Sequence, residues 1–186
     1  AEALKAVLLS DPDVVFVADV TSLETAKIAC ELAMTGHLVI VQMHATSAVN
    51  ACEQLLHLGV NPYHLAASLI GITSQRLMRK LCPACRSKHD GSTGDIALDY
   101  LQITKEEIDT NSVYQSQGCS ECRETGHRGR TVAFEMLQVN KAFTDSLTTG
   151  NLEEKPDWNY RPMRLDVKDK VLAGITSPDE GQRILF

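Results

Sequence analysis

Four cysteines form two pairs with the spacing of metal-binding knuckles, Cys82-Pro-Ala-Cys85 and Cys119-Ser-Glu-Cys122. Two C-x-x-C knuckles place four thiolates around one tetrahedral ion, and soft sulfur ligands in that geometry favour zinc. The spacing therefore predicts a structural zinc that closes a subdomain and takes no part in a reaction. A thioredoxin-like redox pair is the alternative, although it requires only one of the two pairs. Unliganded thiols are the remaining interpretation.

Two polar residues follow apolar runs at positions where parallel sheets bind their ligands. Residues 13–20 (DVVFVADV) and 38–43 (LVIVQM) have the apolar, β-branched pattern of strands that are buried on both faces. Ligands bind beyond the carboxyl ends of such strands, so Asp19 and His44 are candidate site residues. Asp19 has the chemistry to hold Mg²⁺ or to orient an attacking water, and His44 to contact a phosphate. The alternatives are an aspartate that caps a turn and a solvated histidine.

The segment between these two runs predicts a helix. Thr21 and Glu24 have the T-x-x-E spacing of a capping box, and Gly36 has the position of a C-cap. A strand, a helix and a strand joined by tight turns form a βαβ unit, in which the two strands are parallel. Further helices are expected from Ser47, from Asn61-Pro62, near residues 104–109 and 140–149, and from Ser177, with strands at 69–77 and 131–139.

Composition limits the classes of function. The chain has 186 residues and a net charge of −6, which gives no overall attraction to nucleic acid. No apolar run approaches the roughly 20 residues of a membrane span, and no secretory signal is recognised. The six cysteines fit a reducing cytoplasm better than a disulfide scaffold. No G-x-x-x-x-G-K-[ST] phosphate loop occurs, and the helix-like run that opens at Ala1 suggests a piece of a longer protein.

Several other polar residues near the knuckles have a weaker case. His89 and His127 are close enough in sequence to be substitute zinc ligands. Arg123, Arg128 and Arg130 gather near the second knuckle, where they form either a local basic patch or ordinary pairs with carboxylates. Paired or solvated arginines are the commoner outcome. A nucleic-acid-binding zinc ribbon is therefore the least favoured function.

Five segments in order resemble the secretion ATPases of type II secretion and type IV pilus assembly, and the resemblance covers nearly the whole chain. LLSDPDVVFVADVTSLETAKIA is similar to the Walker B segment of that family, and TGHLVIVQMHATSAVNA to its histidine box. ASLIGITSQRLMRKLCPACR and GCSECRETGHRGRTVAFEML resemble the two sides of its zinc subdomain. KVLAGITSPDEGQRIL resembles its C-terminal helix pair.

The resemblance implies an α/β fold, the C-terminal part of a RecA-like P-loop NTPase core with an inserted tetracysteine zinc subdomain and C-terminal helices. It implies residues 1–81 as part of the core, 82–130 as the zinc-binding subdomain, and 131–186 as the strand and helices that complete the ATPase domain. Asp19 and His44 are then the expected catalytic residues, with Asp19 also contacting the Mg²⁺–ATP cofactor.

The function implied is that of a cytoplasmic hexameric motor, peripheral to the inner membrane. It docks on inner-membrane platform proteins and uses ATP and Mg²⁺ to drive pseudopilus or pilus assembly. The Walker A loop and arginine fingers are expected upstream of Ala1, so the chain alone is expected to be inactive. The alternative is a catalytically inactive, zinc-bearing assembly or docking module of a secretion or pilus machine.

The chain also departs from the family pattern in and near both motifs. At the Walker B segment the family glutamate is replaced by Asp19, whose side chain is one methylene shorter. This change is expected to slow hydrolysis in the longer protein. The other departures are Ala18 for glycine, Thr21-Ser22 for Arg-Asp, Gln42-Met43 for Thr-Leu, and His127 for tyrosine.

Overall fold

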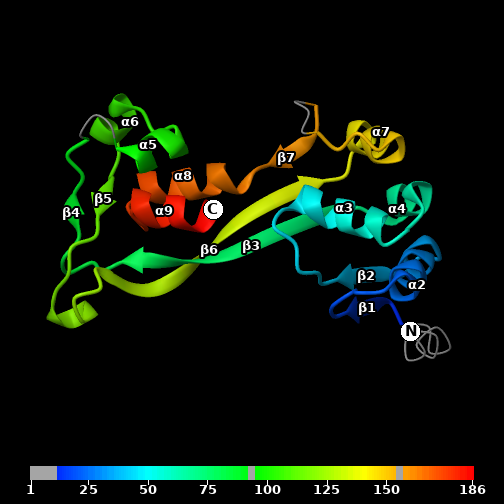
Figure 1. The fold of residues 1–186 in the computed structure, drawn as a ribbon. Coiled ribbons are helices and arrows are strands. Elements are labelled where there is room, and N and C mark those ends of the chain that lie inside the picture. Colours follow the sequence, from blue (N-terminus) through cyan, green and yellow to red (C-terminus); the bar gives the residue numbers. More distant parts are fainter. Residues whose placement is uncertain (1–11, 92–94, 154–156) are drawn as a thin grey trace. The chain divides into compact units, whose positions relative to one another are not determined.

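The computed structural model describes residues 12–91, 95–153 and 157–186, and it contains both helices and strands (Figure 1). By packing, the chain divides into two compact units that interleave along the sequence. Unit 1 consists of residues 1–74 and 136–160, and unit 2 of residues 75–135 and 161–186.

The three predicted segments do not coincide with these units. The segment 82–130 falls within unit 2, whereas the segment 131–186 is divided between the two units. Because the units are defined by packing alone, the assignment of functional domains to 1–81, 82–130 and 131–186 stays a prediction.

Unit 1 contains the predicted βαβ arrangement. Strand β1 (Val14–Val17) and strand β2 (Leu38–Val41) pair in parallel, with Val14 opposite Leu38 and Val17 opposite Val41 (Figure 1). The helix between them, α2 (Leu23–Met34), packs against β2 and supplies buried Ile28 and Leu32 to the core. The parallel pairing follows from the tight turns on either side of the helix, as the sequence pattern predicts.

The expectation that both strands are buried on both faces is wrong. Val15 and Val17 are buried, but Phe16 is 61% exposed and Ile40 is 49% exposed. The described residues form a sheet of only two strands here, and α2 covers one of its faces. The apolar pattern therefore predicts the strands correctly, but other chain segments would be needed to cover the second face.

The start of α2 is shifted by one residue from the predicted capping box. Ser22, not Thr21, is the N-cap, and its hydroxyl accepts a hydrogen bond from the Thr25 N–H at 3.3 Å. Ser22 has the extended backbone that an N-cap requires, with φ −131° and ψ 148°. The helix ends at Thr35 as C-cap, and Gly36 follows with φ +102°, a conformation that glycine adopts without strain.

Three further helices belong to the described part of unit 1. Helix α3 (Ala48–His57) begins at Ser47 and helix α4 (Pro62–Ser68) at Asn61, as predicted, because each N-cap side chain accepts a backbone N–H. Helix α7 (Lys141–Thr149) packs against α4. Trp158 is buried and meets the Phe143 ring edge-on, with 4.8 Å between ring centroids.

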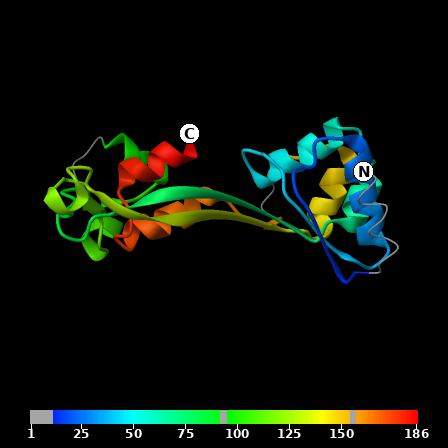
Figure 2. The same cartoon turned by 90° about the horizontal axis from the view of Figure 1, so that it is seen from below.

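A second sheet has the strand order β3-β6-β7 and contributes residues to both units. Strand β3 (Gly71–Leu81) and strand β6 (His127–Gln138) lie side by side in Figures 1 and 2, and β7 (Asn159–Arg161) pairs with β6. The predicted strands cover residues 69–77 and 131–139. In the structure, β3 continues to Leu81 and β6 begins at His127, so both strands extend further toward the cysteine knuckles. The Cys82 N–H donates to the Gly126 carbonyl at 2.9 Å, so pairing continues into the first knuckle.

Unit 2 surrounds the knuckles with short elements. Its strands β4 (Ser87–Lys88) and β5 (Tyr114–Gln115) are antiparallel. Its other elements are α5 (Ile96–Leu101), α6 (Lys105–Thr110), the 3₁₀ turn η2 (Ser120–Cys122), α8 (Met163–Leu172) and α9 (Pro178–Leu185). Helix α6 lies where a helix is predicted near residues 104–109, and it begins with a complete capping box between Thr104 and Glu107.

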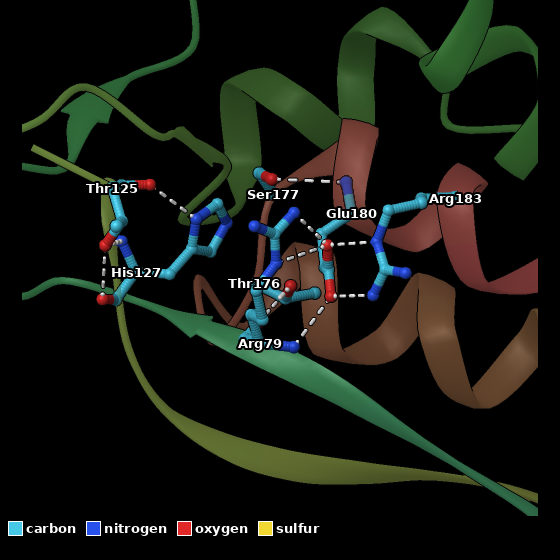
Figure 3. Close-up of polar contacts among 7 residues, drawn as sticks. All are labelled: Arg79, Thr125, His127, Thr176, Ser177, Glu180 and Arg183. Atoms are coloured by element: carbon cyan, nitrogen blue, oxygen red, sulfur yellow. Dashed lines mark hydrogen bonds and ion pairs between the residues drawn. The ribbon is translucent and has the colours of Figure 1, made fainter.

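A buried carboxylate fastens α9 to β3 (Figure 3). Glu180 has a fully buried side chain and accepts the backbone N–H of Arg79 at 2.8 Å. The guanidinium groups of Arg79 and Arg183 each donate two further hydrogen bonds to it, at 2.7–2.9 Å. Burial by itself would raise the pKa of Glu180, but these N–H groups of Arg183 and Arg79 outweigh it and lower the pKa to about 2.

Candidate functional site

The carboxyl ends of β1 and β2 bring Asp19 and His44 to one edge of the sheet. Beyond the paired strands, the Gln42 N–H donates to the Val17 carbonyl at 3.0 Å and the Val20 N–H to the Gln42 carbonyl at 3.2 Å. These bonds continue the pairing up to the two candidate residues. The position predicted from the rule for parallel sheets is therefore the position observed.

Asp19 has an uncommon backbone conformation. Its φ of +53° lies in the left-handed region, where aspartate and asparagine are tolerated better than most residues. Such conformations cluster at functional sites, because the surrounding structure must hold them in place. Asp19 lies two residues beyond the end of β1, which is the place where a ligand of a parallel sheet would bind.

Asp19 and His44 line one hollow of about 470 Å³ in unit 1. Its wall also contains Gln54 and His57 of α3, which no motif or spacing in the sequence indicates as site residues. The remaining lining residues are apolar or small: Val20, Thr21, Met43 and Leu58. A carboxylate and two imidazoles in the wall of one hollow have the chemistry to hold a metal-bound phosphate or to orient a water, as expected for phosphoryl chemistry. Among the described residues, however, no lysine or arginine lines this hollow.

A neighbouring hollow of about 500 Å³ shares His57 but has different chemistry. Its wall contains Glu53 and Glu153 and the turn after α7. Two carboxylates in the wall disfavour a phosphate group, so the smaller hollow with Asp19 and His44 is the better candidate.

The four predicted cysteines converge in unit 2. Their sulfur atoms all lie within 4.8 Å of one another. The Sγ–Sγ distances are 4.0 Å for Cys82–Cys119, 3.8 Å for Cys85–Cys122 and 3.7 Å for Cys119–Cys122. Four bonds of about 2.3 Å to a tetrahedral zinc put the sulfurs about 3.8 Å apart. The donor set therefore fits one tetrahedral ion, and the distances are far too long for a disulfide, with its S–S bond of about 2.05 Å.

The backbone around the second knuckle is arranged to stabilise thiolate sulfur. The N–H groups of Cys119 and Gly126 donate to the Cys122 sulfur at 3.3 and 3.2 Å. Desolvation raises the pKa of Cys122, but these N–H groups outweigh it and lower that pKa to about 6. Desolvation and hydrogen bonds from the other three thiols raise the pKa of Cys85 to about 12. A metal ion would shift all four cysteines toward the thiolate that it binds.

The two histidines considered as substitute ligands have other roles. The Nδ1 of His89 accepts the Gly91 N–H at 3.0 Å, and its Nε2 lies 3.0 Å from an Asp95 carboxylate oxygen. The Nδ1 of His127 lies 2.9 Å from the Thr125 carbonyl (Figure 3). Among the described residues, the only group of potential ligands close enough to hold one ion is the four cysteines.

Arginines near the knuckles are at least partly engaged within the unit. Arg86 donates to the Gly174 carbonyl at 2.7 Å, and its guanidinium lies 4.3 Å from the centroid of the Tyr114 ring. Arg128 pairs with Glu121 at 3.4 Å. Of the three arginines considered for a basic patch, Arg128 is thus paired with a carboxylate, and the patch stays a prediction for Arg123 and Arg130. No helix among the described residues is both long and apolar enough to span a bilayer.

Comparison with known proteins agrees with these features. The family model for type II/IV secretion system proteins matches residues 1–183. Type II secretion system protein E of Klebsiella pneumoniae is 38% identical over 188 aligned positions, which cover 99% of this chain and 37% of that protein. The type IV pilus assembly ATPase PilB of Thermus thermophilus is 37% identical, over 97% of this chain and 21% of that protein. The chain thus spans well under half the length of these relatives.

Solved structures with low sequence identity have a similar fold. The pilus retraction motor PilT with bound ADP aligns over 99% of this chain and 43% of its own, with a TM-score of 0.66 and 22% identity. The ATPase DotB of Yersinia pseudotuberculosis aligns over 98% of this chain and 39% of its own, with a TM-score of 0.63 and 14% identity. These likenesses support the α/β fold, and the sequence matches show that the chain belongs to the type II/IV secretion system protein family.

Proposed function

We propose that this chain is the C-terminal part of an ATPase motor that drives pseudopilus or pilus assembly, with Asp19 as its Walker B carboxylate. The observation that carries the proposal is the hollow in which Asp19 and His44 meet at the carboxyl ends of β1 and β2. Relatives over the whole chain are named as type II secretion and type IV pilus assembly proteins, which supports this role.

In this proposal the two residues have separate tasks in phosphoryl transfer. The Asp19 carboxylate holds Mg²⁺ through a ligand water or orients the attacking water, and His44 contacts the terminal phosphate of ATP. Catalysis of this kind depends on positioning and on positive charge that stabilises the transferred group. Because no described lysine or arginine lines the hollow, this charge must come from other parts of the longer protein or from neighbouring subunits.

The remaining parts of the proposal concern assembly. The whole motor has a RecA-like core, forms a cytoplasmic hexamer and docks on inner-membrane platform proteins. The cysteine centre holds one zinc through Cys82, Cys85, Cys119 and Cys122. Bound there, zinc supplies a tetrahedral cross-link between the two knuckles and no chemistry with ATP.

One observation favours the alternative of a docking module without hydrolysis. The cysteine centre has the geometry of a complete metal site, whereas the hollow at Asp19 lacks a described cationic side chain. The shorter Asp19 and the loss of the Arg-Asp pair point in the same direction. A module of this kind would keep its zinc centre and its fold, and would bind its partner without turnover.

Steady-state ATP turnover of the full-length motor separates the two candidates. Asp19→Asn is the informative variant, because asparagine also tolerates the left-handed backbone and only the charge is lost. We expect turnover to fall about 100-fold, the scale on which a misplaced or missing catalytic group acts. Asp13→Asn is the matched control, since Asp13 precedes β1 at its opposite end.

The outcomes are distinct. Unchanged turnover in Asp19→Asn, in an otherwise active motor, would reduce Asp19 to a polar residue at a turn. A full-length protein without turnover, which still binds its platform partner, would favour the docking module. Asp19→Glu restores the family side chain and tests whether the methylene limits the rate.

A further inference from the structure

The turn between α8 and α9, residues 173–176, lies against the first cysteine knuckle. Arg86, which follows Cys85, donates from Nη1 to the Gly174 carbonyl at 2.7 Å. Leu81, which precedes Cys82, donates its N–H to the Ile175 carbonyl at 2.9 Å. The two residues that flank the first knuckle are therefore both hydrogen-bonded to this turn.

The segment that leads to the second knuckle closes the turn from another side. The Ser112 N–H donates to the Leu172 carbonyl at 3.1 Å. Gly174 has φ +68°, and a Cβ atom there would lie 2.6 Å from the Ser112 carbonyl oxygen and 2.8 Å from the Tyr114 ring. The same ring lies beneath the Arg86 guanidinium. Only glycine fits this position, so the turn fills a space whose walls are set by both knuckle-bearing segments.

The contacts continue from the turn into α9 (Figure 3). The Thr176 hydroxyl donates to the Arg79 carbonyl at 2.8 Å. Arg79 in turn binds the Glu180 carboxylate through its backbone N–H and its guanidinium. The hydrogen bonds of Arg86 to the turn, the backbone of the turn, and the bonds of Thr176 and Arg79 therefore connect the first knuckle to the first turn of α9.

The knuckles have little apolar packing with which to hold their own position. The core of unit 2 includes Met78, Leu101, Val113 and Val171. Among the described residues, neither apolar core contains a member from 82–88 or 114–126. The knuckles are joined by the four converging sulfurs and by the Cys82 to Gly126 backbone bond, and just beyond them by the short β4–β5 pairing. Structural metals supply folding free energy where a small core cannot.

We propose that metal in the four-cysteine centre controls how firmly the 173–176 turn and α9 are held, and that Arg86 transmits this effect. The inference rests on the metal site proposed above. When the sulfurs are not held together, the first knuckle relaxes and Arg86 no longer reaches Gly174. The turn before α9 then loses part of the surface against which it packs, and α9 is held less firmly. Arg86 is a positioning residue, because it acts through the turn and touches no ligand.

The opposing expectation is that α9 is held by its own contacts. Its residue Gly181 packs closely on Val167 of α8, with 2.8 Å from an ideal Cβ to a valine methyl, and Ile184 is in the apolar core. If these contacts suffice, the metal state of the knuckles will leave α9 and its turn unaffected. The two expectations predict different hydrogen-exchange rates after metal removal for backbone amides that bond to the turn and to α9.

Hydrogen–deuterium exchange of the chain, with one equivalent of zinc and after chelation, measures those rates. The reporter amides are Leu81, Ser112 and Arg79, which donate to Ile175, Leu172 and Glu180. We expect chelation to accelerate their exchange about tenfold or more, the scale of a local opening. The reference amides are Leu38 and Gln42 of the βαβ unit and Ile108 of α6, whose exchange should stay within about twofold.

Two arginine variants test the route in the zinc-loaded chain. Arg86→Lys keeps the charge but loses the planar group that both stacks on Tyr114 and reaches Gly174. We expect it to retain one zinc and yet to accelerate the three reporter amides about tenfold, with little further change on chelation. Arg128→Lys is the matched control, since Arg128 lies near the same centre but pairs with exposed Glu121. Its exchange should equal that of the unmodified chain.

Four results would overturn the inference. Reporter amides that stay slow after chelation, while the 118–126 amides accelerate, would show that α9 is held independently. Acceleration of Ile108 equal to that of the reporters would mean that unit 2 unfolds as a whole. Normal reporter exchange in zinc-loaded Arg86→Lys would exclude Arg86 as the transmitting residue. Failure of the chain to bind zinc would remove the premise, yet leave the ATPase proposal intact, because that rests on Asp19 and His44.

Discussion

Replacement of Glu180 by glutamine tests the link between α9 and β3 most directly. The Glu180 side chain is fully buried, and five N–H groups from Arg79 and Arg183 donate to its two oxygens. Glutamine has nearly the same shape, but its amide nitrogen cannot accept those N–H groups, and its carbonyl carries no charge. The variant therefore leaves two guanidinium groups facing a neutral side chain.

The size of the effect follows from the carboxylate pKa. The ordinary glutamate pKa is about 4.3, and the folded protein lowers it to about 2, a difference worth about 3 kcal/mol. The Arg79 and Arg183 side chains are 48% and 54% exposed, so solvent screening makes this an upper value. Loss of one partner of a buried ion pair gives a similar range of about 3–5 kcal/mol. We expect Glu180→Gln to lower the free energy of unfolding of unit 2 by about 2–3 kcal/mol.

Denaturant unfolding of the zinc-loaded chain at pH 7 measures this change. Asp179→Asn is the matched control, because Asp179 is the neighbouring acid in the first turn of α9 and has an exposed position. Its loss should cost only about 0.3–1 kcal/mol, through the helix dipole. If the free energy of unfolding of Glu180→Gln lies within about 0.5 kcal/mol of that of the unmodified chain, the assigned role of the carboxylate is refuted.

The same carboxylate predicts a pH dependence whose sign is fixed. Because folding lowers the pKa of Glu180, its stabilisation is complete above the unfolded value of about 4.3 and is lost as the pH falls toward 2. The difference in stability between the unmodified chain and Glu180→Gln should therefore shrink across that window. Taking the difference removes acid effects that the two proteins share, including protonation of the cysteine ligands. A constant difference from pH 5 to pH 2 would contradict the assigned pKa.

Four shorter predictions concern the metal, the nucleotide and the turns. Elemental analysis of protein purified without chelators should give about one zinc per chain, and well under one would count against the tetracysteine centre. Chelation should accelerate amide exchange in the knuckle segments 82–88 and 114–126 while the βαβ unit keeps its slow exchange, and parallel acceleration in both would contradict this. The chain alone should show no ATP turnover and no micromolar ATP affinity by calorimetry, because no phosphate loop is present. Gly174→Ala should destabilise the chain by more than about 2 kcal/mol, because the added Cβ would collide with the Ser112 carbonyl. Gly36→Ala adds its Cβ to open space and should cost only about 1 kcal/mol; thermal unfolding of both variants measures the difference.

The local features of this protein can be predicted from its sequence because their causes are local. The N-caps Ser47, Asn61 and Ser177 each satisfy an N–H two or three residues away, so a short window contains both partners. The βαβ pattern with its short turns requires parallel strands, and this places Asp19 and His44 at one edge. The two knuckles contain all four sulfurs of the centre, which leaves only their convergence for the fold to provide.

Contacts between residues that are far apart in the sequence could not be predicted in this way. Glu180 has the spacing of a capping-box residue, yet its carboxylate binds Arg79, 101 positions away, because burial against β3 offers stronger donors than its own helix end. His57 has no local signal and enters the hollow only because α3 is packed beside the strand ends. Apolar periodicity predicts strands but not which faces are covered, so Phe16 and Ile40 were expected inside and are exposed. Hydrogen bonds and periodicity within a short segment can be predicted from that segment alone. Burial, ion pairs and cavity walls depend on which remote segments the folded chain brings together.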